Sequence, residues 1–220
     1  MNPMTDDDYI RALIAEGEHR QQDFKFEISD ARKIARTLSA FANTAGGRLL
    51  IGVKDNGRIA GVRSEEEAYM IEAAARLYCS PEVEYTLTTH RAEGRIVLVA
   101  EVAESVSKPV YARDESGKGW AYVRVADENI LATRVHIRVW KQAARPLGEL
   151  VEFSDRERFL LDFLRENEYI TFNQYCRKGR ISRREAEVLL ARFIRFGIAE
   201  PCFIEHNFCF RLCRSDVSDV

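Results

Sequence analysis

The chain has 220 residues, of which 46% are hydrophobic and 31% are charged, and its formal net charge is −2 at pH 7. Such a composition is typical of folded globular domains and excludes extended disorder. The slightly negative net charge excludes attraction to phosphate over the whole surface, so any nucleic-acid-binding surface must be local.

Basic residues are concentrated late in the chain. Residues 1–30 contain eight acids and three bases, whereas residues 171–197 contain seven bases and two acids. A surface that binds phosphate is therefore expected in the second of these regions.

The N-terminal sequence and the cysteines indicate the compartment. The N-terminal sequence lacks the basic start and the apolar stretch of a secretory signal, and no apolar run approaches the ~20 residues of a membrane span. Five cysteines without a CxxC pair are expected to be reduced thiols. These features predict a cytoplasmic protein that does not contact a membrane.

The first 145 residues predict a mixed α+β domain. Helices are expected over residues 6–16, from the Ser29-Asp30 cap to Gly46-Gly47, over 64–79 and over 127–143. Strands are expected over residues 20–27, 48–53, 83–90, 96–102 and 121–125, with a further strand that returns after the Asp55-Asn56-Gly57 turn. These helices and strands are predicted from the apolar spacing within each element and from the capping or turn residues at its ends.

Residues 146–153 are expected to be a linker, and residues 154–216 a second, small domain. Its predicted elements are helices over residues 155–166, 171–178 and 182–196, and strands over 199–204 and 208–212 that are joined by residues 205–207. Three helices followed by a β-hairpin is the order of a winged helix-turn-helix domain.

Three motifs of the first domain resemble the Schlafen AlbA-type family, a divergent AAA group. They are EHRQQDFK at residues 18–25, AFANTAGGRLLIGVKDNGRIAGV at 40–62 and YVRV at 122–125. The resemblance covers residues 8–140 and implies a mixed-sheet domain with a DNA-binding role. The chain departs from the family pattern at Asp23, where glutamate is usual.

The resemblance aligns Glu18, Asp23 and Asp55 with the carboxylates of ribonuclease-active members of the family. Three converging acids could hold Mg²⁺ or Mn²⁺ and activate water for phosphodiester cleavage, with Lys25 neutralising the developing charge. Alternatively, Glu18 is solvated, Asp23 and Lys25 form a surface pair, and Asp55 simply opens a turn. Because neither Glu18 nor Asp23 lies on an inferred core stripe, replacing either by alanine is expected to leave folding intact.

Two further ligands are disfavoured. The family is often described as ATP-binding, but in the segment 47–54 the lysine comes one place late for a phosphate-binding loop and no Ser or Thr follows it. Cys202, His206, Cys209 and Cys213 are potential zinc ligands without a usual zinc spacing. Strand alternation is also expected to direct Cys209 and Cys213 away from Cys202.

The helix over residues 182–196 is the candidate recognition helix. Its predicted buried stripe consists of Ala186, Leu189, Leu190, Phe193 and Ile194, and its predicted outward stripe of Arg184, Glu187, Ala191 and Arg195. With Arg183, and with Arg177, Lys178 and Arg180 just before the helix, this face is expected to bind nucleic acid. The alternative is a solvated basic face on a domain that mediates dimerisation or partner contact.

The leading hypothesis is a DNA-binding transcriptional regulator. A homodimer is expected, because the nucleases that the first domain resembles carry it twice in one chain, and a dimer would match a palindromic site. The alternatives are a Mg²⁺- or Mn²⁺-dependent endoribonuclease acting on RNA in defence, and a protein-interaction adaptor without nucleic-acid contact.

Overall fold

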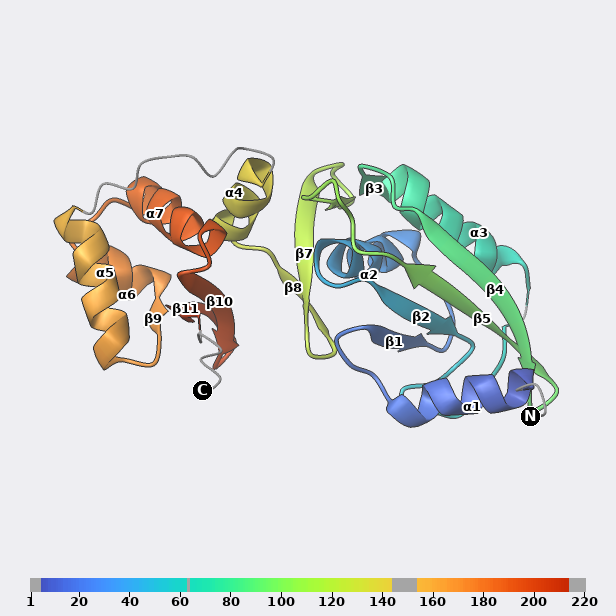
Figure 1. Ribbon diagram of the computed structural model, residues 1–220. Helices are drawn as coiled ribbons and strands as arrows, with labels where there is room; N and C mark the ends of the chain where they lie inside the picture. Colours follow the sequence, from blue (N-terminus) through green and yellow to red (C-terminus); the bar gives the residue numbers. More distant parts are fainter. Residues whose placement is uncertain (1–4, 63, 144–153, 214–220) are drawn as a thin grey trace. The chain divides into compact units, whose positions relative to one another are not determined.

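The computed structural model describes residues 5–62, 64–143 and 154–213 (Figure 1). Contacts divide the chain into two compact units, Met1–Ala132 and Thr133–Val220. Each unit has its own hydrophobic core and is described by itself.

Unit 1 contains four helical segments and eight strands within its described residues. Its helices are α1 (Asp6–Glu16), α2 (Ala31–Asn43), α3 (Glu66–Ala73) and the π-helix η1 (Ala74–Tyr78). Its strands are β1 (Gln22–Lys25), β2 (Gly47–Ile51), β3 (Cys79–Ser80), β4 (Tyr85–Ala92), β5 (Arg95–Val102), β6 (Tyr111–Arg113), β7 (Gly119–Val125) and β8 (Glu128–Leu131).

These strands form two sheets, in the orders β1-β2-β5-β4 and β3-β6-β7-β8. In the first sheet β1 is parallel to β2, whereas β5 is antiparallel to both of its neighbours. The sheet is therefore of mixed orientation, and the predicted α+β fold class is confirmed.

Helix α2 lies between the two sheets, and α1 covers the opposite face of the first sheet (Figure 1). The alternation of strand side chains separates the two faces: Leu49 and Ile51 of β2 face the α2 core, whereas Leu50 faces α1. Because α2 is covered on two sides, even its polar Thr37, Ser39 and Asn43 are buried.

The buried polar residues of α2 bind the second sheet. Asn43 donates to the carbonyls of Val110 and Tyr122 and accepts from the Val110 N–H. Ser39 donates to the Val110 carbonyl and accepts from the Tyr122 N–H. The asparagine of the AFANT motif is therefore a structural link between α2, strand β7 and the residue that precedes β6.

Two sequence predictions for unit 1 are wrong. The Asp55-Asn56-Gly57 turn forms, but the segment after it makes only a single bridge, Val53 to Ile59, rather than a returning strand. The helix expected over residues 127–143 begins only at Arg134, because the chain reverses at Ala126, with a φ of 50°, and continues as β8 beside β7.

Unit 2 contains the remaining elements, and several match their predicted bounds. They are α4 (Arg134–Gln142), α5 (Asp155–Glu166), β9 (Ile170–Thr171), α6 (Phe172–Lys178), α7 (Arg183–Arg195), β10 (Ala199–Ile204) and β11 (Asn207–Leu212). The strands form one sheet in the order β10-β11-β9.

Helix α4 belongs to unit 2, whereas the sequence placed it at the end of the first domain. It packs against α7, and its Val135 and Val139 join the core of unit 2. The expected linker at residues 146–153 lies outside the described residues.

His136 of α4 gives unit 2 a pH dependence. The ring packs edge-on against Phe208 at 4.7 Å, and its Nδ1 accepts from the backbone N–H of the helix cap Thr133. Burial lowers the pKa of His136 to about 4. A histidine that is held neutral in the folded state is protonated more readily in the unfolded state, so acid favours unfolding.

We predict that unit 2 loses about 3 kcal/mol of its free energy of unfolding from this residue as the pH falls from about 6.5 to about 4. His136→Gln keeps an acceptor for the cap and removes the titration, so its stability should decline less over that range. Denaturant unfolding of both proteins at several pH values measures the difference. Parallel pH profiles would contradict the prediction.

Candidate functional site

Asp23 is the most buried of the predicted acidic site residues. It lies in β1 beside Leu49 of β2 and is 4% exposed. Arg124 Nη2 lies 3.1 Å from its Oδ1, and Lys25 Nζ lies 2.8 Å from its Oδ2. Both oxygens of this carboxylate therefore have a cationic partner.

Arg124 is a site residue that the sequence analysis did not single out. It comes from β7 and is 3% exposed, and its guanidinium lies over the Phe41 ring at 5.2 Å. It also donates to Asn129 Oδ1 and to the Gln22 carbonyl, while its backbone N–H donates to Thr44 Oγ1. The available signal was the arginine within YVRV, an otherwise apolar strand.

Glu18 lies next to this ion pair. Its Oε1 accepts from the Phe24 N–H at 2.9 Å. Burial, together with the Asp23 carboxylate, raises the pKa of Glu18 against the lowering effect of that N–H and of Lys25. Glu18, Asp23, Lys25 and Arg124 thus lie together in the structure.

Asp55 is exposed in its turn and does not complete an acidic metal site. Among the described residues, no group of three or more His, Cys, Asp or Glu side chains is placed to hold a metal ion. Glu18 and Asp23 contribute two negative charges, which Lys25 and Arg124 balance. A three-carboxylate Mg²⁺ or Mn²⁺ site does not fit this arrangement.

Asp23 is buried, contrary to the premise on which Asp23→Ala was expected to leave folding intact, and this substitution would leave the buried Arg124 without its carboxylate. Breaking a buried ion pair from one side costs about 3–5 kcal/mol, whereas an exposed pair contributes about 0–1 kcal/mol. We therefore predict a large loss of stability in Asp23→Ala and little change in the control Glu72→Ala, which breaks the exposed Glu72–Arg76 pair.

A double-mutant cycle separates this pair from general damage. Asp23→Ala combined with Arg124→Met removes both charges, so it should cost clearly less than the sum of the two single substitutions. Urea unfolding of the full chain measures the four proteins. Additive losses would show that the two residues do not depend on each other.

A second cluster lies at the junction of α6 and α7. Five basic side chains are exposed in the last turn of α6, the connecting turn and the first turn of α7: Arg177, Lys178, Arg180, Arg183 and Arg184. We call these five residues the basic turn. The nearby acid Glu185 accepts from the Ser182 cap and pairs with Arg156, so its charge is already balanced.

Aromatic rings and a polar side chain fix part of the basic turn. Arg183 lies over Phe172 at 5.1 Å and donates to Asn173 Oδ1, and Lys178 lies over Phe163 at 4.6 Å. Arg184 is exposed, and within the described part of the chain it has no hydrogen-bond or ion-pair partner. Its guanidinium is therefore available to a ligand.

The predicted outward stripe of α7 is mostly covered, contrary to expectation. Glu187 is 7% exposed and Ala191 is fully buried, because α4 packs on this face. Arg195, in the last turn, is half-buried and engaged in an interaction. Of the predicted stripe, Arg184 in the first turn is the exposed member.

The cysteines of the hairpin also differ from expectation. Cys202 lies directly opposite Cys209 in the β10–β11 register, so the two residues share one face of the sheet rather than opposite faces. Cys209 is 1% exposed, and His206 lies in the connecting turn with a φ of 60°. The described cysteines and histidines form no group that could hold zinc.

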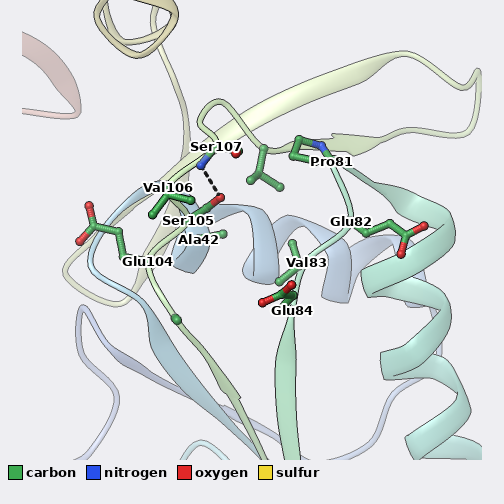
Figure 2. Close-up of a pocket in the computed structure, with 11 residues that line it drawn as sticks. Ala42, Pro81, Glu82, Val83, Glu84, Glu104, Ser105, Val106 and Ser107 are labelled. Atoms are coloured by element: carbon green, nitrogen blue, oxygen red, sulfur yellow. Dashed lines mark hydrogen bonds between the residues drawn. The ribbon is translucent and has the colours of Figure 1, made fainter. Parts of the chain in front are cut away.

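A hollow of about 320 Å³ in unit 1 does not suit phosphate (Figure 2). Its lining includes three acids, Glu82, Glu84 and Glu104, and none of its lining residues is basic. Ser107 N–H donates to Ser105 Oγ at its rim, so this group is already satisfied (Figure 2). This hollow is therefore not a candidate phosphate site.

The mixed-sheet unit and its buried motif residues define an α+β domain of the AlbA type. A family model described as Schlafen, AlbA_2 matches residues 18–133, more than half of the chain. The chain belongs to the Schlafen, AlbA_2 family, and this membership suggests nucleic-acid binding.

Two solved structures are similar to this chain. The DIP2311 protein from Corynebacterium diphtheriae is 20% identical with a TM-score of 0.47, and the match covers 71% of this chain and 37% of that one. The N-terminal domain of a RecG-related protein from Nitrosomonas europaea is 24% identical with a TM-score of 0.41, and the match covers 56% of this chain and 90% of that one.

The chain thus spans little more than a third of the DIP2311 protein. Comparison with curated proteins gives no significant match. In the described parts of the structure, no helix has the length and apolar character needed to cross a membrane.

Proposed function

We propose that this chain is a DNA-binding transcriptional regulator whose second unit contacts duplex DNA as a winged helix-turn-helix. The observation that carries the proposal is the basic turn, in which five exposed cations lie within eight residues at the start of a helix. Family membership supports the broader statement that the ligand is nucleic acid.

The order of the elements in unit 2 supports the winged-helix assignment. Helices α5, α6 and α7 precede the β10–β11 hairpin, and β9 pairs with β11 to complete a small sheet. Helices α6 and α7 are joined by residues 179–182, the short connection of a helix-turn-helix. In that motif the first turn of the second helix contacts base edges in the major groove.

The contacts within the basic turn suggest different roles for its members. Arg184 is exposed and unpaired within the described residues, so we assign it the base contact. Arg183 is held by Phe172 and Asn173, which suits a positioned phosphate contact. We assign Arg195 at most a phosphate contact, because α4 covers the middle of the face between it and Arg184.

Alanine at Arg183 and Arg184 should weaken duplex binding without unfolding the protein, since both side chains are exposed. A phosphate contact contributes about one unit to the slope of log affinity against log salt concentration. A base contact contributes about 1–3 kcal/mol of binding free energy and sets the preferred base at one position of the duplex. Arg183→Ala should therefore reduce the salt slope, and Arg184→Ala should relax sequence preference.

Fluorescence anisotropy with labelled duplexes at several salt concentrations measures both effects in the full chain. Arg165→Ala is the matched control, because Arg165 is likewise an exposed cation, lies on α5 and pairs with Asp162 on the surface. Wild-type binding that is independent of salt, or equal losses in the control, would overturn the proposal.

We also propose that the regulator is a homodimer, which would present two basic turns to a palindromic site. Light scattering of the full chain at concentrations on the order of tens of micromolar should give the mass of two chains. A monomer under these conditions, with and without duplex, would contradict the dimer.

The endoribonuclease alternative is not favoured by the acidic cluster, because the two grouped carboxylates are balanced by Lys25 and Arg124. The adaptor alternative gives no reason for the concentration of exposed cations in the basic turn.

A further inference from the structure

Within the described residues of unit 2, a groove between α4 and α7 is also basic. It has a volume of about 410 Å³, and its lining residues are Arg134, Ile137, Arg138, Lys141, Gln142 and Glu187. Five of them come from α4, and Glu187 comes from α7. Within this lining, three cations are opposed by one carboxylate, which leaves a net charge of +2.

The spacing of the cations places them on one side of α4. Arg134, Arg138 and Lys141 are separated by four and three residues, so they follow one another along a single helix face. The side chain of Arg134 is 87% exposed and Lys141 is exposed, whereas Arg138 is 30% exposed. The groove thus has two exposed cations at its rim and one more buried cation between them.

The carboxylate of Glu187 uses only part of the hydrogen-bonding capacity of these arginines. Arg138 Nη2 lies 3.4 Å from Glu187 Oε2, and Arg134 Nη1 lies 3.8 Å from Oε1. In the described structure Arg138 Nε is buried without an acceptor. Two guanidiniums that share one carboxylate retain donors for a further anion.

The groove adjoins the surface of the proposed DNA contact. Glu187 follows Arg184 by three residues on α7, a rise of about 4.5 Å along the helix. A nucleic-acid strand held at the first turn of α7 would therefore have its backbone close to the rim cations of α4.

We propose that the α4–α7 groove binds a backbone phosphate of duplex nucleic acid, which extends the contact surface beyond the basic turn. This inference rests on the proposed function, since the same unit holds the duplex. Helix α4 then has two roles. It covers Glu187 and Ala191 in the middle of α7, and it supplies cations of its own next to this covered face.

The test is a charge-neutral variant of the two rim cations, Arg134→Gln with Lys141→Gln, in the full chain. The matched control is Arg158→Gln with Arg165→Gln, which removes the same charge from exposed ion pairs of α5, outside the groove. Duplex binding is measured by anisotropy over a salt series, and circular dichroism checks that both variants are folded.

In the groove variant we expect the slope of log affinity against log salt concentration to be smaller in magnitude by about one unit. This change corresponds to the loss of one phosphate contact. The control should keep the wild-type slope. The exchange Arg134→Lys with Lys141→Arg should also keep it, because both positive charges are preserved. Equal slopes in the groove variant, the control and the wild type would overturn the inference while duplex binding itself stands. Absence of duplex binding by the wild type would overturn the proposed function together with the inference.

Discussion

The buried ion pair between Asp23 and Arg124 is the interaction on which the architecture of unit 1 depends. It connects β1 of the first sheet with β7 of the second, and the arginine lies over Phe41 of the helix between them. Removing two charges from water is costly, and close contact and the added bonds of Arg124 to Asn129 and Gln22 reduce this cost. Within the described residues, Asp23 Oδ2 and Arg124 Nε are buried without a hydrogen-bond partner. The same contact engages the carboxylate that a metal site would require.

The two units use their charges differently, and this difference supports the proposed duplex contact by unit 2. In the buried cluster of unit 1, opposite charges balance one another. In unit 2 the acids Glu185 and Glu187 are also paired, but the basic turn and the rim of the α4–α7 groove leave cations exposed. The proposed phosphate contacts are therefore local, so they are compatible with a net charge of −2 on the chain.

Local signals predicted the elements whose ends are set by neighbouring residues. Capping boxes at Thr5 and Ser154 begin α1 and α5 where the sequence placed them. Interactions between distant residues were not predictable in this way. The covering of Glu187 by α4, the pairing of Cys202 with Cys209 and the burial of Arg124 all depend on which segments meet in space. Strand alternation failed for the cysteines because parity along one strand does not specify its register with another.

The central claim is that the start of α7 and the turn before it are the contact surface for duplex nucleic acid. Hydrogen–deuterium exchange of the full chain, with and without a saturating duplex, tests it most directly. The method follows backbone exchange in both units in one experiment and so shows which of them the duplex protects. The account predicts slower exchange over residues 177–188 on binding. Protection confined to unit 1, with unchanged exchange over these residues, would contradict it.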